Sequence, residues 1–158
     1  MKKTIYQNAI EQIDVLFDHV ITNSASDFLR VDIGMISTDL ASEIYKNSML
    51  SLDNFIVSVD SFCIKHTMNQ HGTEKEELRG QIPINKYELG LLTEVVENPD
   101  KVYSRRKTAV GYDSLIIEKT IGNLYFFSVW EIRIIKSLKK GKKSRIMLQT
   151  FYIRRVKN

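Results

Sequence analysis

The chain has 158 residues, a length that suits one domain with a single hydrophobic core. With 43% hydrophobic and 27% charged residues but only 2 Pro and 7 Gly, the composition excludes the disordered, collagen-like and low-complexity classes. No apolar run is long enough for a membrane span or a secretory signal, and the single cysteine, Cys63, cannot form an internal disulfide. We therefore expect a folded cytoplasmic protein.

Charge is distributed unevenly along the chain. Residues 1–100 contain 8 Lys and Arg against 16 Asp and Glu, a net charge of −8, whereas residues 101–158 contain 15 against 3, a net charge of +12. A basic segment with few acids favours a polyanionic partner, either nucleic acid or a membrane surface, through counterion release and electrostatic steering. A solvated basic surface without a partner is the alternative interpretation.

In the first part of the chain the hydrophobic pattern predicts helices and short strands. Apolar residues at three- and four-residue steps predict a helix over residues 4–22, and alternation predicts a strand over residues 28–36. Ser37 or Thr38 is then expected to cap a second helix. A short strand is expected near NFIVSVD, and the following SFCIKHTMNQHG predicts a helix that ends at Gly72.

After a further helix that ends near Asn98 and Pro99, the pattern changes to strands. Residues 114–155 contain three β-rich runs, joined first by IGN and then by a lysine-rich tip around Gly141. This order predicts a single α+β domain over residues 1–158, in which N-terminal helices pack on a C-terminal antiparallel β-sheet. The basic charge would then lie on the sheet and its loops.

A two-residue turn at Lys140 and Gly141 would fix the register of the last hairpin. One face would be mostly core, with the pairs Trp130–Phe151, Ile132–Gln149 and Ile134–Met147. The other face would carry the pairs Glu131–Thr150, Arg133–Leu148, Val129–Tyr152 and Phe127–Arg154. This second face gathers an acid, a hydroxyl, a phenol and two guanidinium groups. An exposed sheet face with ordinary cross-strand polar pairs is the alternative.

The histidines do not predict a metal site. A spacing of five puts His66 and His71 about 140° apart on a helix, so they do not share a face as an i, i+4 zinc pair does. The chain also lacks the HExxH, paired CxxC, P-loop and GxGxxG motifs. Acid-base catalysis is the remaining function that the imidazole groups of these histidines could have. The alternative is that the histidines are structural or face the solvent.

Two basic segments could present guanidinium groups to phosphate. EELRGQIPI places Arg79 before an extended Ile-Pro-Ile, and SRRKTAVGYD supplies Arg105, Arg106 and Lys107 before the first long strand. A turn held by a local ion pair and a solvated loop are the respective alternatives.

The order of the motifs resembles a known nuclease family. IKHTMNQHG is followed by EELRGQIPI, ENPDKVY, a strand with VWEIRI and finally LQTFYIRR. Over about residues 28–155 this order is similar to the phage and mobile-element branch of the barnase/EndoU/colicin/RelE-like (BECR) nucleases, while residues 1–24 lie outside the resemblance. It implies a BECR-like α+β fold and metal-independent cleavage of RNA, with tRNA among the substrates it allows, by a toxin or effector. An immunity protein or a host protein is the further partner implied.

The resemblance implies no metal or cofactor and suggests which residues act. The candidate catalytic residues are His66, His71, Arg79, Glu131, Thr150 and Tyr152. The candidate RNA-binding residues are Lys65, Arg105, Arg106, Lys107, Arg133, Lys139, Lys140, Lys142, Lys143 and Arg154.

These residue types suit the chemistry. Attack of a 2′-hydroxyl on the adjacent phosphorus needs a base, an acid for the 5′-oxygen and cations for the phosphorane. A histidine with Glu131 can supply the first two, and the basic side chains the third. Which histidine is base or acid stays open, as does the oligomeric state. A non-catalytic module that binds nucleic acid or a host protein is the first alternative, and an oligomer in which acidic helices meet a basic sheet is the second.

Overall fold

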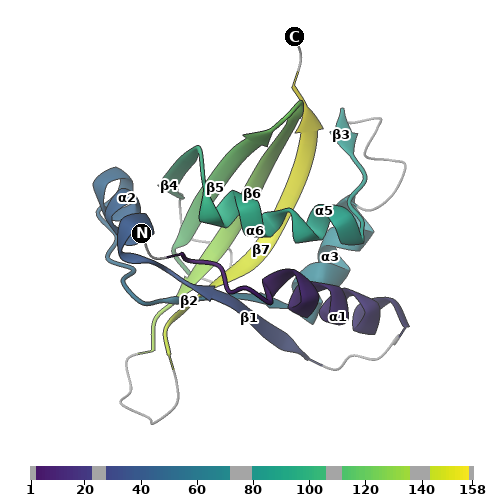
Figure 1. Cartoon of the computed structure of the whole chain (residues 1–158), viewed down its shortest axis with the longest axis horizontal. Coiled ribbons are helices and arrows are strands. Elements are labelled where there is room, and N and C mark those ends of the chain that lie inside the picture. The colour runs from purple at the N-terminus through teal and green to yellow at the C-terminus, as the bar shows by residue number, and fades with distance from the viewer. Residues whose placement is uncertain (1–2, 23–27, 72–79, 106–111, 136–142, 157–158) are drawn as a thin grey trace.

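The computed structural model describes residues 3–22, 28–71, 80–105, 112–135 and 143–156. Helices pack against one face of a large sheet, and in Figure 1 α1, α5 and α6 lie across it. The helices are α1 (Ala9–Thr22), α2 (Thr38–Ser48), α3 (Ser61–His71), α5 (Lys86–Gly90) and α6 (Leu92–Glu97). The predicted α+β class, with helices packed on a mostly antiparallel sheet, is confirmed.

The sheet joins strands from both halves of the chain. Its order is β1-β2-β7-β6-β5-β4, and β3 pairs with β7 off this path. All pairs are antiparallel except β2 with β7, which run parallel. The strands are β1 (Arg30–Met35), β2 (Ile56–Asp60), β3 (Gln81–Ile82), β4 (Lys101–Arg105), β5 (Ser114–Ile121), β6 (Leu124–Arg133) and β7 (Arg145–Arg155). The sheet is therefore not built from the C-terminal meander alone.

Strand β7 pairs with three other strands and also contacts a helix. Along one edge it pairs with β6, while its other edge pairs with β2 at the start and with β3 at the end. Between these two partners α3 packs against β7, and the Cys63 thiol donates a hydrogen bond to the Gln149 carbonyl oxygen at 3.4 Å. Segments distant in the sequence thus meet along one strand.

The predicted register of the last hairpin is wrong. Glu131 lies opposite Met147, and Thr150 lies opposite Val129, because Arg133 pairs with Arg145 rather than with Leu148. The corresponding observed pairs, where the structure gives them, are Trp130–Leu148, Ile132–Ile146 and Phe127–Tyr152.

A bulge between Val129 and Trp130 shifts the register by one more residue and leaves Gln149 without a partner in this ladder. Leu148 therefore faces the core, where the prediction put Gln149 and Met147, and Met147 faces the other side. The predicted side was nevertheless right for Thr150 and Tyr152, because the observed pairing beyond the bulge differs from the prediction by two residues, which preserves the alternation.

The predicted first helix was too long at its start. It begins at Ala9, because the preceding segment forms a bridge between Ile5 and Gly34, with a hydrogen bond from the Met35 amide to the Thr4 carbonyl oxygen at 2.9 Å. Arg105, expected in a loop, ends strand β4. The expected cap of α2 is Ser37, whose hydroxyl accepts from the Leu40 amide at 3.2 Å.

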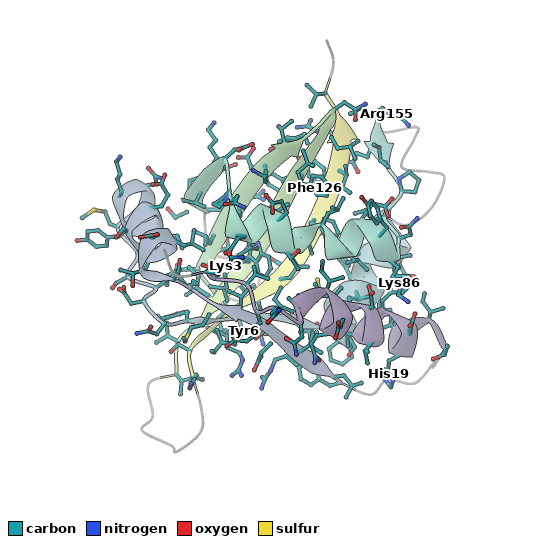
Figure 2. All side chains as sticks on the ribbon, in the orientation of Figure 1. Lys3, Tyr6, His19, Lys86, Phe126 and Arg155 are labelled. Carbon is teal, nitrogen blue, oxygen red and sulfur yellow. The ribbon has the colours of Figure 1, made fainter. Side chains whose placement is uncertain are left out.

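The core lies between the helices and one face of the sheet. Trp130, Phe126 and Phe151 are its largest fully buried side chains. Figure 2 shows Phe126 within the sheet and Arg155 at the end of β7 beside β3. Because apolar residues of all the described helices pack on this one face, the opposite face of the sheet is left to other side chains.

We expect Gly34→Ala to lower the free energy of unfolding by about 1–3 kcal/mol, because a side chain at this position overpacks a close backbone contact. An added Cβ would lie 2.5 Å from the Thr4 carbonyl oxygen. Gly90→Ala is the matched control: its nearest neighbour is Ile10 Cγ2 at 3.7 Å, and alanine is the better helix former. Urea unfolding followed by circular dichroism measures both, and equal stability of the two variants would contradict the expectation.

Candidate functional site

The face of the sheet opposite the helices carries polar and aromatic side chains, and we call it the polar face. It is made of the residues on β4–β7 that alternate with the core positions. Across these strands they form three rows: Thr120, Tyr125 and Arg154; Lys101, Glu118, Phe127 and Tyr152; and Tyr103, Ile116, Val129 and Thr150. Gln81 of β3 extends the first row, since it pairs with Arg154.

Tyrosines from different strands gather around one carboxylate. Tyr125 on β6 donates a hydrogen bond to Glu118 on β5, and Glu118 also raises the pKa of Tyr103 on β4. Tyr152 on β7 lies close enough to affect both phenols electrostatically. Burial, and then the hydrogen bond and charge of Glu118, raise the pKa of Tyr103 to about 12, and the same causes raise the pKa of Tyr125. These phenols therefore stay protonated and act as donors at neutral pH.

Aromatic rings and a guanidinium group extend this cluster toward β7. The rings of Phe127 and Tyr152 stack with centroids 4.9 Å apart and planes 21° from parallel. The Arg154 guanidinium lies 5.0 Å from the Tyr125 ring centroid and 5.4 Å from that of Tyr152. We call Tyr103, Glu118, Tyr125, Tyr152 and Arg154 the tyrosine cluster. It combines donors, an acceptor, a cation and ring surfaces on one side of the sheet.

Glu131 and Arg133 lie further along the same face of β6. The Arg133 guanidinium is 3.7 Å from Glu131 Oε2 and 5.1 Å from the centroid of the Tyr112 ring. Glu131 is 8% exposed, whereas 39% of the Arg133 side chain is exposed, so the ion pair joins a buried carboxylate to a partly exposed guanidinium group. Tyr125 and Arg133 are eight residues apart on β6, about 27 Å in an extended strand. The predicted phosphate-binding residues Arg133 and Arg154 therefore cannot contact the same phosphate.

A third polar group connects β1, β2 and β7. Arg145 Nη2 lies 3.3 Å from Asp32 Oδ2, Arg145 Nε donates to Ser58 Oγ at 3.3 Å, and Ser58 donates in turn to Asp32 at 2.7 Å. These contacts pair the half-exposed carboxylate of Asp32 with the largely buried guanidinium group of Arg145. We interpret this group as structural, because its members neutralise one another.

Helix α3, which packs against β7, carries His66. Cys63 and Thr67 are buried, whereas Lys65 and His66 are exposed on the outer side of the helix. The pKa of the Cys63 thiol is raised by burial and by the negative charges of Asp60 and Glu131, so this cysteine is not a nucleophile at neutral pH.

The other site residues that were predicted from the sequence lie at several different positions along the chain. Thr150 is half-buried opposite Val129, and Arg105 and Lys143 are exposed. The side chain of His71 lies outside the described part of the chain, as do Arg79, Arg106, Lys107, Lys139, Lys140 and Lys142. Within the described ranges no three His, Cys, Asp or Glu side chains are placed to hold a metal ion.

The sequence interpretation missed Glu118, Tyr103, Tyr125 and Gln81. The sequence did contain a signal that could have singled out Glu118, because residues 101–158 contain only three acidic residues and Glu118 is one of them. The IGN turn also fixes the register of β5 against β6, which places Glu118 opposite Phe127 and Thr120 opposite Tyr125.

Comparison with protein-family models, with curated proteins and with solved structures finds no match for this chain. Among the described residues, no helix has the length and apolar character needed to cross a membrane. The function is therefore inferred from the geometry of the polar face.

We expect Glu118→Gln to lower the pKa of Tyr103 from about 12 toward its ordinary value of 10.0, because the substitution removes the negative charge beside the phenol. A phenol with a raised pKa in the folded state contributes stability that is fully present below pH 10 and is lost as pH rises through 12. Ultraviolet absorbance of tyrosinate, with Tyr103→Phe identifying the signal, measures the titration. An unchanged titration of Tyr103 in the Gln variant would contradict the assignment.

Proposed function

We propose that this protein is a metal-independent endoribonuclease of a phage or other mobile element, acting as a toxin or effector, and that it binds RNA on the polar face of its sheet. The observation that carries the proposal is the tyrosine cluster. Four strands in the basic part of the chain contribute Tyr103, Glu118, Tyr125, Tyr152 and Arg154 to one face, where these side chains are half-buried or exposed. Ile116 and Val129, further along the same face, are buried.

The composition of the polar face supports binding of single-stranded RNA. Unstacked bases bind to aromatic rings and guanidinium planes, and Phe127, Tyr152 and Arg154 supply both kinds of surface. Lys101 and Arg105 on β4 add exposed positive charge on the same face. The net charge of +12 over residues 101–158 favours the approach of a polyanion.

The proposed reaction is transesterification by the 2′-hydroxyl. The bond from the 2′-oxygen to phosphorus forms as the bond to the 5′-oxygen breaks, which leaves a 2′,3′-cyclic phosphate and a free 5′-hydroxyl. A base takes the 2′-proton and an acid returns one to the 5′-oxygen. We assign one of these roles to the exposed imidazole of His66 on α3, the helix that packs against β7. Tyr152 is the proposed hydrogen-bond donor to the phosphate, and Arg154 stabilises its charge.

We expect the purified protein to cleave RNA in the presence of EDTA and to leave 2′,3′-cyclic phosphate ends. His66→Ala should lower the cleavage rate by a factor on the order of 10² or more and leave RNA affinity nearly unchanged, because a general acid or base acts mainly in the transition state. His19→Ala, in α1, is the matched control and should retain the activity. Gel analysis of labelled RNA with end-group mapping gives the result.

Two outcomes would overturn this mechanism. One is cleavage that requires a divalent ion. The other is cleavage that persists at the original rate when both His66 and His71 are replaced by alanine.

A non-catalytic RNA-binding module is the second candidate function. One observation favours it: Glu131, which was predicted to lie opposite Thr150 and to act with a histidine in catalysis, forms an ion pair with Arg133 and lies opposite Met147 instead. A folded protein that binds RNA but cleaves none would support this second function.

RNA affinity should depend on Arg154 far more than on Arg155. The two arginines are neighbours on β7, so alternation places Arg154 on the polar face and Arg155 on the other side. We expect Arg154→Ala to weaken binding by about tenfold, because it removes both a phosphate contact and a stacking plane, and to reduce the salt dependence of the affinity. Fluorescence anisotropy at several salt concentrations measures this, and equal losses in the two variants would place the RNA elsewhere.

A further inference from the structure

We infer that the protein forms a two-fold symmetric dimer, in which strand β1 of one copy pairs antiparallel with β1 of a second copy. The inference is independent of the proposed function, because it concerns one edge of the sheet rather than the polar face. Strand β1 is the first strand in the order β1-β2-β7-β6-β5-β4. Within the described residues, only the segment from Thr4 to Tyr6 forms backbone hydrogen bonds with the outer side of this strand.

Hydrogen bonds at the start of β1 show which backbone groups face a partner. The amide and the carbonyl group of Leu29 both point toward the side of β2, because they bond to Ser61 Oγ at 3.0 Å and to the Ser61 amide at 2.8 Å. Backbone groups alternate in direction along an antiparallel strand, so those of Val31 also point toward β2. The amide and carbonyl groups of Arg30 and Asp32 therefore point outward.

The bulge between Asp32 and Gly34 limits the open part of this edge. It interrupts the alternation, so the Ile33 carbonyl also points outward, where it accepts a hydrogen bond from the Tyr6 amide at 2.9 Å. The segment that contains Tyr6 thus covers the second half of β1. The part that remains for another chain is short and is centred on Val31.

A two-fold axis at Val31 matches these outward groups to one another. In an antiparallel pair centred on Val31, Arg30 of each copy lies opposite Asp32 of the other. The outward amide and carbonyl groups then form a hydrogen-bonded pair at both positions, and the two Val31 residues form the non-hydrogen-bonded pair between them. The backbone of this segment is therefore self-complementary, as an isologous interface requires.

The side chains at these positions are also self-complementary in charge. Arg30 and Asp32 lie 3.8 Å apart on the same face of β1, and about two fifths of each side chain is exposed (39% and 41%). Charged residues usually discourage pairing at a sheet edge, but this register places opposite charges across the interface twice. Asp32 also lies 3.3 Å from Arg145 Nη2, and a carboxylate has acceptor capacity for a second guanidinium group.

Exposed apolar side chains flank the paired segment. Phe28 and Leu29 come directly before it, and the Phe28 ring packs on the exposed ring of Phe62 with centroids 5.4 Å apart. In the proposed register Leu29 approaches the partner's Ile33 and the exposed Tyr6 that is bonded to it. Burial of these side chains at both ends adds a hydrophobic contribution to the backbone pairing.

The symmetry also determines how the two sheets are joined. The two-fold axis of such a strand pair is perpendicular to the sheet, so side chains at equivalent positions lie on the same side in both copies. The dimer therefore has one continuous sheet, with both polar faces on one side and both layers of helices on the other.

Sedimentation velocity of the full chain at increasing protein concentration tests for the dimer. We expect the unaltered protein to shift from monomer to dimer as its concentration rises. Arg30→Glu should weaken association by about tenfold, because two opposite-charge pairs become like-charge pairs. Arg155→Glu, at the end of β7, makes the same change in net charge and is the matched control, which should associate like the unaltered protein.

An introduced cysteine tests the register. Val31→Cys should give a disulfide-linked dimer under mild oxidation, because the Cα atoms of a non-hydrogen-bonded pair lie about 4.5 Å apart, within the range that a disulfide spans. Ser104→Cys, on the strand at the other edge of the sheet, is the matched control and should link far more slowly. Non-reducing gel electrophoresis measures both rates, and the buried Cys63 is common to both variants.

Three results would overturn the dimer: a monomer at every concentration, equal association of Arg30→Glu and the unaltered protein, or equally fast linking of the two cysteine variants. None of these measurements involves RNA, so the dimer and the proposed nuclease activity can each fail without the other. Because Arg30→Glu changes an exposed side chain, that comparison stands even if Val31→Cys does not fold.

Discussion

The bulge at Gln149 determines what strand β7 presents to each side of the sheet. Strict alternation would place Leu148 and Phe151 on opposite faces, yet both are buried in the core. One extra residue resolves this conflict, and its carbonyl group accepts a hydrogen bond from Cys63 of α3 in place of a ladder partner. Beyond the bulge, Thr150, Tyr152 and Arg154 all face away from the helices. The contribution of β7 to the polar face depends on this one irregularity.

The central position of β7 has a second consequence, which concerns charge. The acidic first part of the chain and the basic last part meet where β2 runs parallel to β7. Arg145, with 16% of its side chain exposed, pairs there with Asp32 of β1. Much of the acidic charge remains on the helical layer, whereas the polar face is made mainly from the basic part of the chain.

The two carboxylates of the polar face differ in their partners. Glu118 accepts a hydrogen bond from the Tyr125 phenol and lies opposite Lys101 on the neighbouring strand. Glu131, further along the same face, lies 3.7 Å from the Arg133 guanidinium group.

The sequence by itself determined the class of fold, most helices and strands, and the side of the sheet on which Thr150 and Tyr152 lie, because hydrophobic periodicity and caps such as Ser37 are local signals. The sequence also placed the basic charge on the sheet, because the basic residues lie in and between the predicted strands. Only the tertiary structure decided the hairpin register, the parallel pairing of β2 with β7 and the gathering of tyrosines around Glu118. These features depend on which strands become neighbours and on the bulge that places both Leu148 and Phe151 in the core. Packing between distant segments selects the strand neighbours and the bulge, whereas local sequence patterns do not.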